Sequence, residues 1–410
     1  MRAFGGATGN RLAQTSTLFL LTFATFGCST GGGTTASLTV PPPPSNSLSF
    51  APIATISSGG TRPGSVALAD FNGDGKMDIA VSNFTSNTIS VFLNKGDGTF
   101  QAPIVSPVQI IALGLGPIAV GDFNQDGKPD LVVGTIAGLQ ADIVLLGNGD
   151  GTFHQLAPIP NSFGFFHARV GDLNGDGHLD LVTGDNGNIS VFLGHGDGTF
   201  SAGTFLPTAS FPSSYLGIVV GDFNGDNKLD IVACDTFSGP FGTLVFYAGK
   251  GDGTFQSPTA VPLISSFPGS LASGDFNGDS KRDLLIGFPG EAFVALGNGD
   301  GTFQLRLSSL IPVSGSNSFL TSNALYVQAA DLNQDGKLDA LVADYDGGTL
   351  TLVLNGALGK LPPDAGIYQF TLKPGLSDIA VGDLNNDGLP DIVVSNALTN
   401  EISIALSQKP

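Results

Sequence analysis

The sequence predicts an all-β fold, a seven-bladed β-propeller of four-stranded antiparallel blades. The first observation behind this prediction is the pattern Asp-x-Asn-x-Asp-x-x-x-Asp, which occurs seven times at intervals of 50 to 56 residues. The second is the set of short apolar segments around each copy, none with sustained helical periodicity. The third is the composition, with 59 Gly and 25 Pro among 410 residues, which suits short strands joined by tight turns. A fixed period indicates a repeat architecture, and four short strands repeated radially make a propeller.

Each repeat contains four candidate strands in the same order. In the first repeat an apolar segment at 65–69 leads into the acidic pattern, a second follows at 78–81, and a third at 89–93. Gly-Asp-Gly-Thr-Phe then precedes a fourth strand at 102–105. Asp-Gly between two apolar runs predicts a hairpin, because Gly accepts the positive φ that the turn needs.

The two ends of the chain predict that the ring is closed. The seventh repeat ends after its third strand, and residues 49–57 resemble the missing fourth strand. We therefore expect residues 49–57 to complete the last blade as its outer strand. This pairing removes the open sheet edges that the alternative, an open solenoid, would expose.

The acidic pattern predicts a cation-binding loop in every repeat. Side chains at positions 1, 3, 5 and 9 turn inward and position 7 offers its backbone carbonyl, as in the first nine positions of an EF-hand loop. All these ligands are hard oxygens, which favours Ca²⁺ over Zn²⁺ or Cu²⁺. Three carboxylates and flexible carbonyls favour Ca²⁺ over Mg²⁺, which demands tighter octahedral geometry. We expect up to seven Ca²⁺ ions; the alternative is a network of Asx turns without metal.

The expected ligands, copy by copy, are Asp70, Asn72, Asp74, Lys76, Asp78; Asp122, Asn124, Asp126, Lys128, Asp130; Asp172, Asn174, Asp176, His178, Asp180; Asp222, Asn224, Asp226, Lys228, Asp230; Asp275, Asn277, Asp279, Lys281, Asp283; Asp331, Asn333, Asp335, Lys337, Asp339; Asp383, Asn385, Asp387, Leu389, Asp391.

Position 6 of the loop is expected to need an unusual backbone conformation. Five copies carry Gly there, whereas the fourth has Asn227 and the fifth has Ser280. Asn tolerates the left-handed region and Ser does so less readily. The fifth site is therefore predicted to be the weakest.

The charge balance fits cation binding. The formal net charge is -19, and the seven patterns contain 21 of the 35 acidic residues. Seven bound Ca²⁺ ions would bring the net charge to -5. Such acidity excludes nucleic acid and an anionic membrane surface as partners.

The N-terminal region is predicted to direct export. Residues 1–27 have the basic start and short apolar stretch of a signal peptide, and Gly27-Cys28 resembles a bacterial lipoprotein processing site. Cys28 is the predicted lipidation site, residues 28–47 form a flexible tether rich in Ser, Thr, Gly and Pro, and residues 48–410 form the propeller. We expect an exported protein, lipid-anchored at a bacterial outer membrane or cell surface; the alternative is plain secretion.

The repeats at 121–127 and 147–153 are similar to FG-GAP/VCBS-type repeats and resemble the calcium-binding blades of the integrin α-subunit propeller. The resemblance covers about residues 48–410. It implies a seven-bladed propeller with Ca²⁺ in the loop between the first and second strands. The chain departs from the pattern at Asn227, at Ser280, and at 356–360, which replaces the usual hairpin turn of the sixth repeat.

Ligand binding is expected on the face opposite the metal loops, where the repeats differ most. The aromatic and His candidates there are Phe165, Phe166, His167, Tyr215, Phe237 and Tyr345. Arg169 breaks a run of mostly small residues at one inner-strand position and is expected to line the central channel and bind an anion or a partner carboxylate. The alternatives are aromatic side chains that cap the blade ends and an ordinary salt bridge for Arg169.

No nucleophile motif, phosphate loop or His–carboxylate pair stands out, so no catalytic residue is predicted. The sequence favours a non-catalytic, Ca²⁺-binding surface or secreted propeller that mediates protein or glycan binding. The alternative is a Ca²⁺-dependent polysaccharide-acting enzyme of the lyase type. Such an enzyme needs a basic residue beside a metal ion on an open groove, and Lys and Arg are scarce on the variable face.

Overall fold

The computed structural model describes residues 48–110, 114–135, 142–160, 162, 164–165, 167–184, 188–207, 215–235, 242–263, 268–288, 290–312, 325–355 and 366–408. They belong to one compact unit, residues 44–410. The predicted signal peptide 1–27, Cys28, the tether 28–47 and the departing turn at 356–360 lie outside the described residues.

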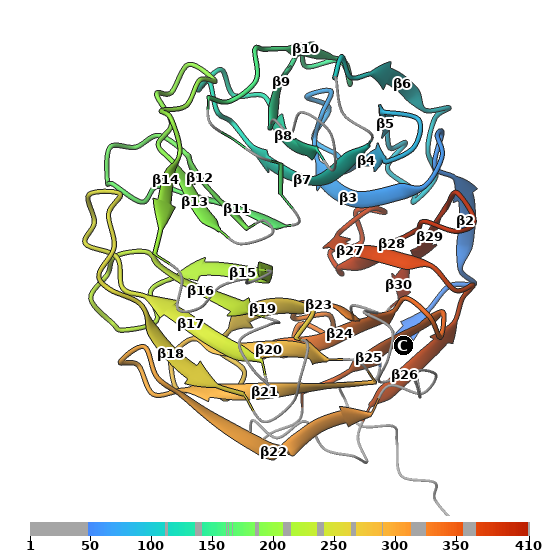
Figure 1. Ribbon diagram of the computed structural model, residues 1–410. Helices are drawn as coiled ribbons and strands as arrows, with labels where there is room; N and C mark the ends of the chain where they lie inside the picture. The colour runs from blue at the N-terminus through green and yellow to red at the C-terminus, as the bar shows by residue number, and fades with distance from the viewer. Residues whose placement is uncertain are drawn as a thin grey trace, which may run out of the picture. The chain divides into compact units, whose positions relative to one another are not determined.

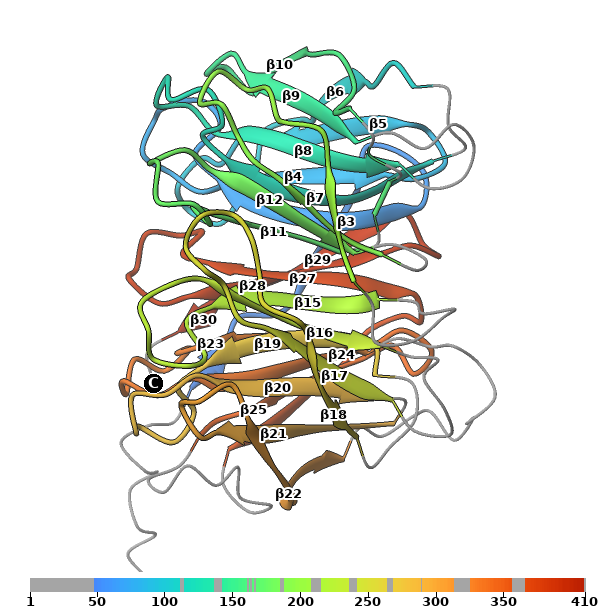
Figure 2. The same cartoon turned by 60° about the vertical axis from the view of Figure 1, so that its left-hand side comes forward.

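The described residues form seven four-stranded antiparallel sheets arranged in a ring, as predicted (Figure 1). Each sheet runs from an inner strand at the central channel to an outer strand at the rim. In a view turned by 60°, connections between the strands lie at the two ends of the sheets (Figure 2). In the part of the chain that the structure describes, no helix is long and apolar enough to cross a membrane.

The strands of the first six blades, from inner to outer, follow chain order. They are β3 (Pro63–Ala69), β4 (Asp78–Asn83), β5 (Thr88–Phe92), β6 (Ile104–Pro107); β7 (Leu115–Gly121), β8 (Asp130–Thr135), β9 (Ile143–Gly147), β10 (Phe153–Gln155); β11 (His167–Gly171), β12 (Asp180–Gly184), β13 (Ile189–Phe192), β14 (Thr204–Leu206); β15 (Tyr215–Gly221), β16 (Asp230–Asp235), β17 (Thr243–Tyr247), β18 (Thr259–Pro262); β19 (Ser270–Gly274), β20 (Asp283–Phe288), β21 (Glu291–Gly297), β22 (Phe303–Pro312); β23 (Leu325–Ala330), β24 (Asp339–Asp344), β25 (Thr349–Val353), β26 (Ile367–Thr371).

The seventh blade joins the two ends of the chain. It contains β27 (Leu376–Gly382), β28 (Asp391–Asn396) and β29 (Glu401–Ala405), and its outer strand is β2 (Ala54–Ser57). β2 pairs antiparallel with β29, from Ala54 opposite Ile404 to Ser57 opposite Glu401. A second short pair, β1 (Ser49–Phe50) with β30 (Ser407–Gln408), lies beside it. The predicted ring closure is confirmed.

The core lies between neighbouring blades. The second strands are buried along their length because both faces of each sheet are covered, which explains their continuous apolar runs. The outer strands alternate between partly covered and exposed residues. One hydrophobic cluster joins Val66 and Ile79 of the first blade to Val393 and Ile402 of the seventh. Burial of apolar surface thus closes the ring in addition to β2 pairing.

Candidate functional site

The acidic loops connect the inner strand of each blade to the second strand. In the first loop, Asp70 Oδ1 accepts hydrogen bonds from the backbone N–H groups of Gly73 at 2.8 Å and Asp74 at 3.1 Å. Asp70 Oδ2 accepts from Gly75 N–H at 2.7 Å. Asn72 Oδ1 accepts from Asp74 N–H at 2.9 Å. The side chains at positions 1 and 3 therefore turn inward and hold the loop closed.

Position 6 has the left-handed backbone conformation in all seven loops, as expected. Asn227 has φ 61° and Ser280 has φ 64°, and the five glycines have φ of 80° to 84°. Position 4 is also left-handed in all seven loops, including Gln125 at 60°, Gln334 at 58° and Asn386 at 57°. Sequence reasoning missed this second requirement because position 4 is not uniformly Gly.

The aspartate at position 9 is a buried strut in every loop. In the third blade Asp180 is fully buried, and its carboxylate accepts N–H bonds from Leu173 at 2.8 Å and Gly194 at 2.8 Å. The same two bonds recur at Asp78, Asp130, Asp230, Asp283, Asp339 and Asp391. Each strut ties the start of its loop to the end of the third strand.

Burial raises the pKa of these carboxyls, the bonded N–H groups oppose that rise, and the neighbouring carboxylates at positions 5 and 1 add to it. The pKa reaches about 6 at Asp78, Asp283 and Asp391, and about 7 at Asp339. The negative charges within one loop therefore repel one another, and a bound cation would relieve this repulsion.

The donor set fits a hard cation by its chemistry. The side chains at positions 1, 3, 5 and 9 offer oxygen atoms. In the seventh loop Asp383 Oδ1 is buried and has no hydrogen-bond partner among the residues that the structure describes. Against this, the Lys76 ammonium lies 2.9 Å from Asp74 Oδ2. Within the described ranges, no three His, Cys, Asp or Glu residues are gathered closely enough to hold a metal. Calcium binding therefore stays a prediction.

The loops also connect neighbouring blades. The second Gly of each hairpin donates its N–H to the carbonyl of position 2 in the preceding blade's loop. The pairs are Gly98 with Leu384, Gly151 with Phe71, Gly198 with Phe123, Gly253 with Leu173, and Gly301 with Phe223. The bond from Gly98 to Leu384, 3.1 Å long, crosses the closure between the first and seventh blades. On this face, hydrogen bonds between hairpins and acidic loops therefore link neighbouring blades.

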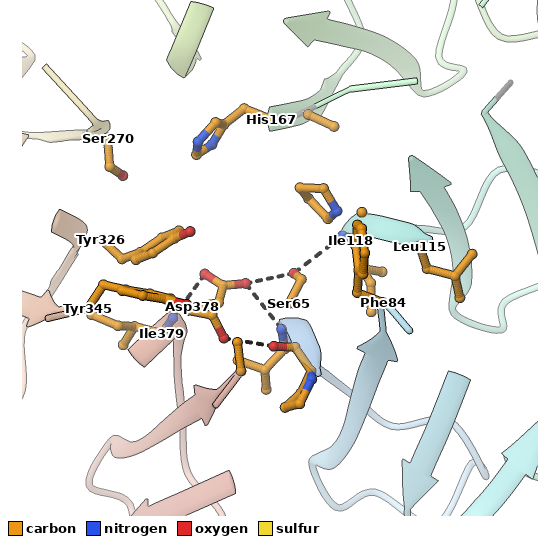
Figure 3. A pocket seen from close by; sticks show the side chains of 18 of the residues that line it. Ser65, Phe84, Leu115, Ile118, His167, Ser270, Tyr326, Tyr345, Asp378 and Ile379 are labelled. Atoms are coloured by element: carbon orange, nitrogen blue, oxygen red, sulfur yellow. Dashed lines mark hydrogen bonds between the residues drawn. The ribbon is translucent and has the colours of Figure 1, made fainter. Parts of the chain in front are cut away.

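The opposite end of the channel holds a cavity of about 630 Å³. Its wall comes from the first residues of the inner strands β3, β7, β11, β23 and β27, with Gly269 and Ser270 at the start of β19. Since each inner strand runs toward its acidic loop, the cavity lies on the face away from those loops. Figure 3 shows the His167 and Tyr326 rings turned toward the opening.

Charged groups of both signs line this cavity. Asp378 Oδ2 accepts hydrogen bonds from Ser65 Oγ at 2.6 Å and Val66 N–H at 3.1 Å, and its Oδ1 accepts from Ile379 N–H at 2.9 Å (Figure 3). Burial raises the pKa of Asp378, while these bonds and the positive charge of Arg169 oppose the rise. Burial lowers the pKa of His167 to about 3, with help from Arg169, so this imidazole is neutral.

Three of the seven predicted ligand-binding residues line the cavity: Arg169, His167 and Tyr345. Phe165 does not: it is 1% exposed and packs between the second and third blades, so it is unavailable to a ligand and caps a blade instead. Tyr215 begins β15. Phe166 and Phe237 lie outside the described residues.

Sequence reasoning missed Asp378, Tyr326 and Ser65. They come from the inner strands of blades seven, six and one, and they meet only because the ring closes. A usable signal existed for Asp378, which is a charged residue directly before the apolar run 379–381 of an inner strand. Cys234 of β16 is fully buried and belongs to the core.

The fold and the seven acidic loops define a class of protein, the repeat propellers with one acidic loop per blade. A family model described as FG-GAP-like repeat matches residues 70–133, 122–183, 172–233, 275–342 and 331–394. The matches cover more than half of the chain, and the chain therefore belongs to the FG-GAP-like repeat family.

Similarity to named proteins agrees with this assignment. Integrin alpha-PS3 of Drosophila melanogaster is 34% identical over 152 residues, which are 32% of this chain and 14% of that protein. Integrin alpha-V of Gallus gallus is 29% identical over 219 residues, 46% of this chain and 20% of that protein. The matched part thus spans a fifth or less of these relatives.

Two solved structures share the fold. An Agrocybe aegerita lectin with specific recognition of non-reducing terminal N-acetylglucosamine has a TM-score of 0.53 at 20% identity, and the match covers 81% of this chain and 85% of the lectin chain. BBS1N in complex with ARL6DN has a TM-score of 0.57 at 12% identity, and the match covers 88% of this chain and 96% of that chain. At these identities the likeness shows the fold alone.

Proposed function

We propose that this chain is a non-catalytic, Ca²⁺-stabilised propeller that binds a protein or glycan ligand in the central cavity. The observation that carries the proposal is the cavity itself. It is lined by the inner strands of six blades, which contribute charged, phenolic and amide side chains. Small-ligand sites are concave, with a few convergent polar groups. The names of the relatives support a binding role: integrin α chains and a lectin share the repeat or the fold.

In this proposal the two faces have separate tasks. The acidic loops hold Ca²⁺ and brace each blade, and the cavity face meets the ligand. Export, with a lipid anchor at Cys28 and a tether at 28–47, would present the cavity outside the cell. A calcium-dependent lyase is not favoured, because the cavity's cations Arg169 and Arg62 lie at the channel end away from the acidic loops.

The test is a screen of glycan and protein arrays with the full chain in Ca²⁺ and in excess chelator. Gln328→Trp fills the cavity from a half-buried position on β23, and Gln101→Trp makes the same change at an exposed position. We expect a ligand that binds wild type and Gln101→Trp but not Gln328→Trp. Binding that is equal in both variants, or turnover of any polysaccharide, contradicts the proposal.

A further inference from the structure

Arg169 is an unusual residue for its place in the propeller. At the equivalent position of the other inner strands the chain has Ala67, Ala119, Val219, Ala272, Gln328 and Ala380. Only the third blade therefore places a permanent positive charge here, and Arg169 lines the cavity. Burial lowers the pKa of its guanidinium, so holding the charge here costs solvation free energy.

Within the described part of the chain, no direct pairing neutralises this charge. Arg169 Nη1 donates to the Ala168 carbonyl at 2.8 Å, and among the described residues it forms no ion pair. Asp378 attracts it through space, but the Asp378 carboxylate is already held by Ser65, Val66 and Ile379. The guanidinium has five N–H donors, so most of these donors remain available to a molecule in the cavity.

Several other cavity side chains carry neutral polar groups that can both donate and accept hydrogen bonds. Burial and the nearby Asp378 raise the pKa of Tyr326, so its phenol keeps its proton. Tyr345 and Gln328 add a second phenol and an amide. Arg62 stacks over Phe84, 4.5 Å from the ring centroid, and places a second cation on the lining. Among the residues that line the cavity, two cations, Arg169 and Arg62, therefore stand against one carboxylate, that of Asp378.

We propose that the cavity binds an acidic sugar residue, with its carboxylate on the Arg169 guanidinium and its hydroxyls on Tyr326 and Gln328. This inference rests on the proposed binding function and names its ligand class. Arg presents a planar fork that matches a carboxylate with two parallel hydrogen bonds. A 630 Å³ cavity lies in the range of small-ligand sites, which suits one or two sugar rings better than an extended peptide.

Calorimetric titration of the full chain in Ca²⁺ tests this inference with three probes: tetragalacturonate, its methyl ester and hexaglutamate. We expect tetragalacturonate to bind and the methyl ester, which lacks the charge, to bind at least ~10-fold more weakly. Arg169→Gln should cause a similar loss, and Arg169→Lys a smaller one because the charge remains. Tyr326→Phe, which removes one hydroxyl from the cavity, should weaken the binding of tetragalacturonate several-fold. Arg282→Gln, at the exposed position 8 of the fifth acidic loop and away from the cavity, is the matched control and should bind as wild type does.

Three results would overturn the inference: no binding of tetragalacturonate to wild type, equal binding of its methyl ester, or undiminished binding to Arg169→Gln. If hexaglutamate binds more tightly than tetragalacturonate, and its binding depends on Arg169 in the same way, the site is assigned to an acidic peptide instead. In each case the array screen with Gln328→Trp still decides the proposed function, so the two failures are distinguishable.

Discussion

At the residue scale, the aspartate at position 9 has a structural task that is independent of any metal. Asp180 is bonded by two N–H groups, from Leu173 at the start of its loop and Gly194 at the end of the third strand. The carbonyl of Leu173 in turn accepts an N–H from Gly253 of the next blade. One buried carboxylate thus fixes its own loop and the residue that contacts the neighbouring blade.

Replacing Asp180 with Asn should therefore destabilise the protein even without calcium. The amide keeps one acceptor but presents an NH₂ group to a backbone N–H, at a cost of about 2 kcal/mol. Urea unfolding in excess chelator measures the loss. Asp346→Asn, at an exposed position, should change the free energy of unfolding by less than ~0.5 kcal/mol. Equal effects of the two substitutions would contradict the structural role of the Asp180 carboxylate.

Ser280 has a left-handed backbone, with φ 64°, at a position where five other loops have Gly. Ser280→Gly should stabilise the fifth blade by about 0.5–1 kcal/mol, because Gly accepts this conformation without the steric cost. It should also tighten calcium binding by the fifth loop, which is the predicted weakest site. Ser273→Gly, within strand β19, is the control and should destabilise. The two variants are compared by thermal unfolding and calcium titration.

At the scale of elements, β2 occupies a position that depends on pairing between the two ends of the chain. Its four residues pair with β29, more than 340 positions later in the chain. Ala51 N–H also donates to the Leu406 carbonyl at 2.9 Å. These contacts couple the N-terminal segment to the stability of the last blade.

A chain that begins at Ser58 should therefore melt lower than one that begins at Pro44. The shorter chain exposes the edge of β29 and loses the closing pairs, so we expect a decrease on the order of 5–10 °C and self-association through that edge. Calorimetry and light scattering measure the two effects. Addition of a peptide that spans residues 48–58 should restore part of the loss. Identical melting of the two chains would show that β2 pairing contributes little.

At the scale of the whole molecule, seven acidic loops place 21 carboxylates on one face of the ring. Their mutual repulsion opposes the compact state, and cations bound only by the folded protein would offset it.

Chelation should lower the melting temperature substantially. Each site occupied at one hundred times its Kd contributes about 2.7 kcal/mol, so even a few occupied loops dominate the effect. Differential scanning calorimetry in Ca²⁺, in Mg²⁺ and in chelator makes the measurement, and Mg²⁺ should restore less than Ca²⁺. An unchanged melting temperature in chelator would refute structural calcium and favour loops held by Asx turns alone.

The sequence by itself determined the number of blades, the strand order within a blade, the acidic loops and the closing strand. Each of these follows from short-range pattern or from the period, because strand alternation and turn chemistry act over a few residues. It also placed Arg169 in the channel, from its contrast with the small residues of the other blades.

Only the tertiary structure decided which side chains meet. Ser65, Tyr326 and Asp378 lie in three different blades and share one cavity because ring closure brings the first, sixth and seventh inner strands together. It also decided that Phe165 is core, since its burial depends on the adjoining blade. The repeat is local, and a binding cavity at the centre of a ring depends on contacts between residues hundreds of positions apart.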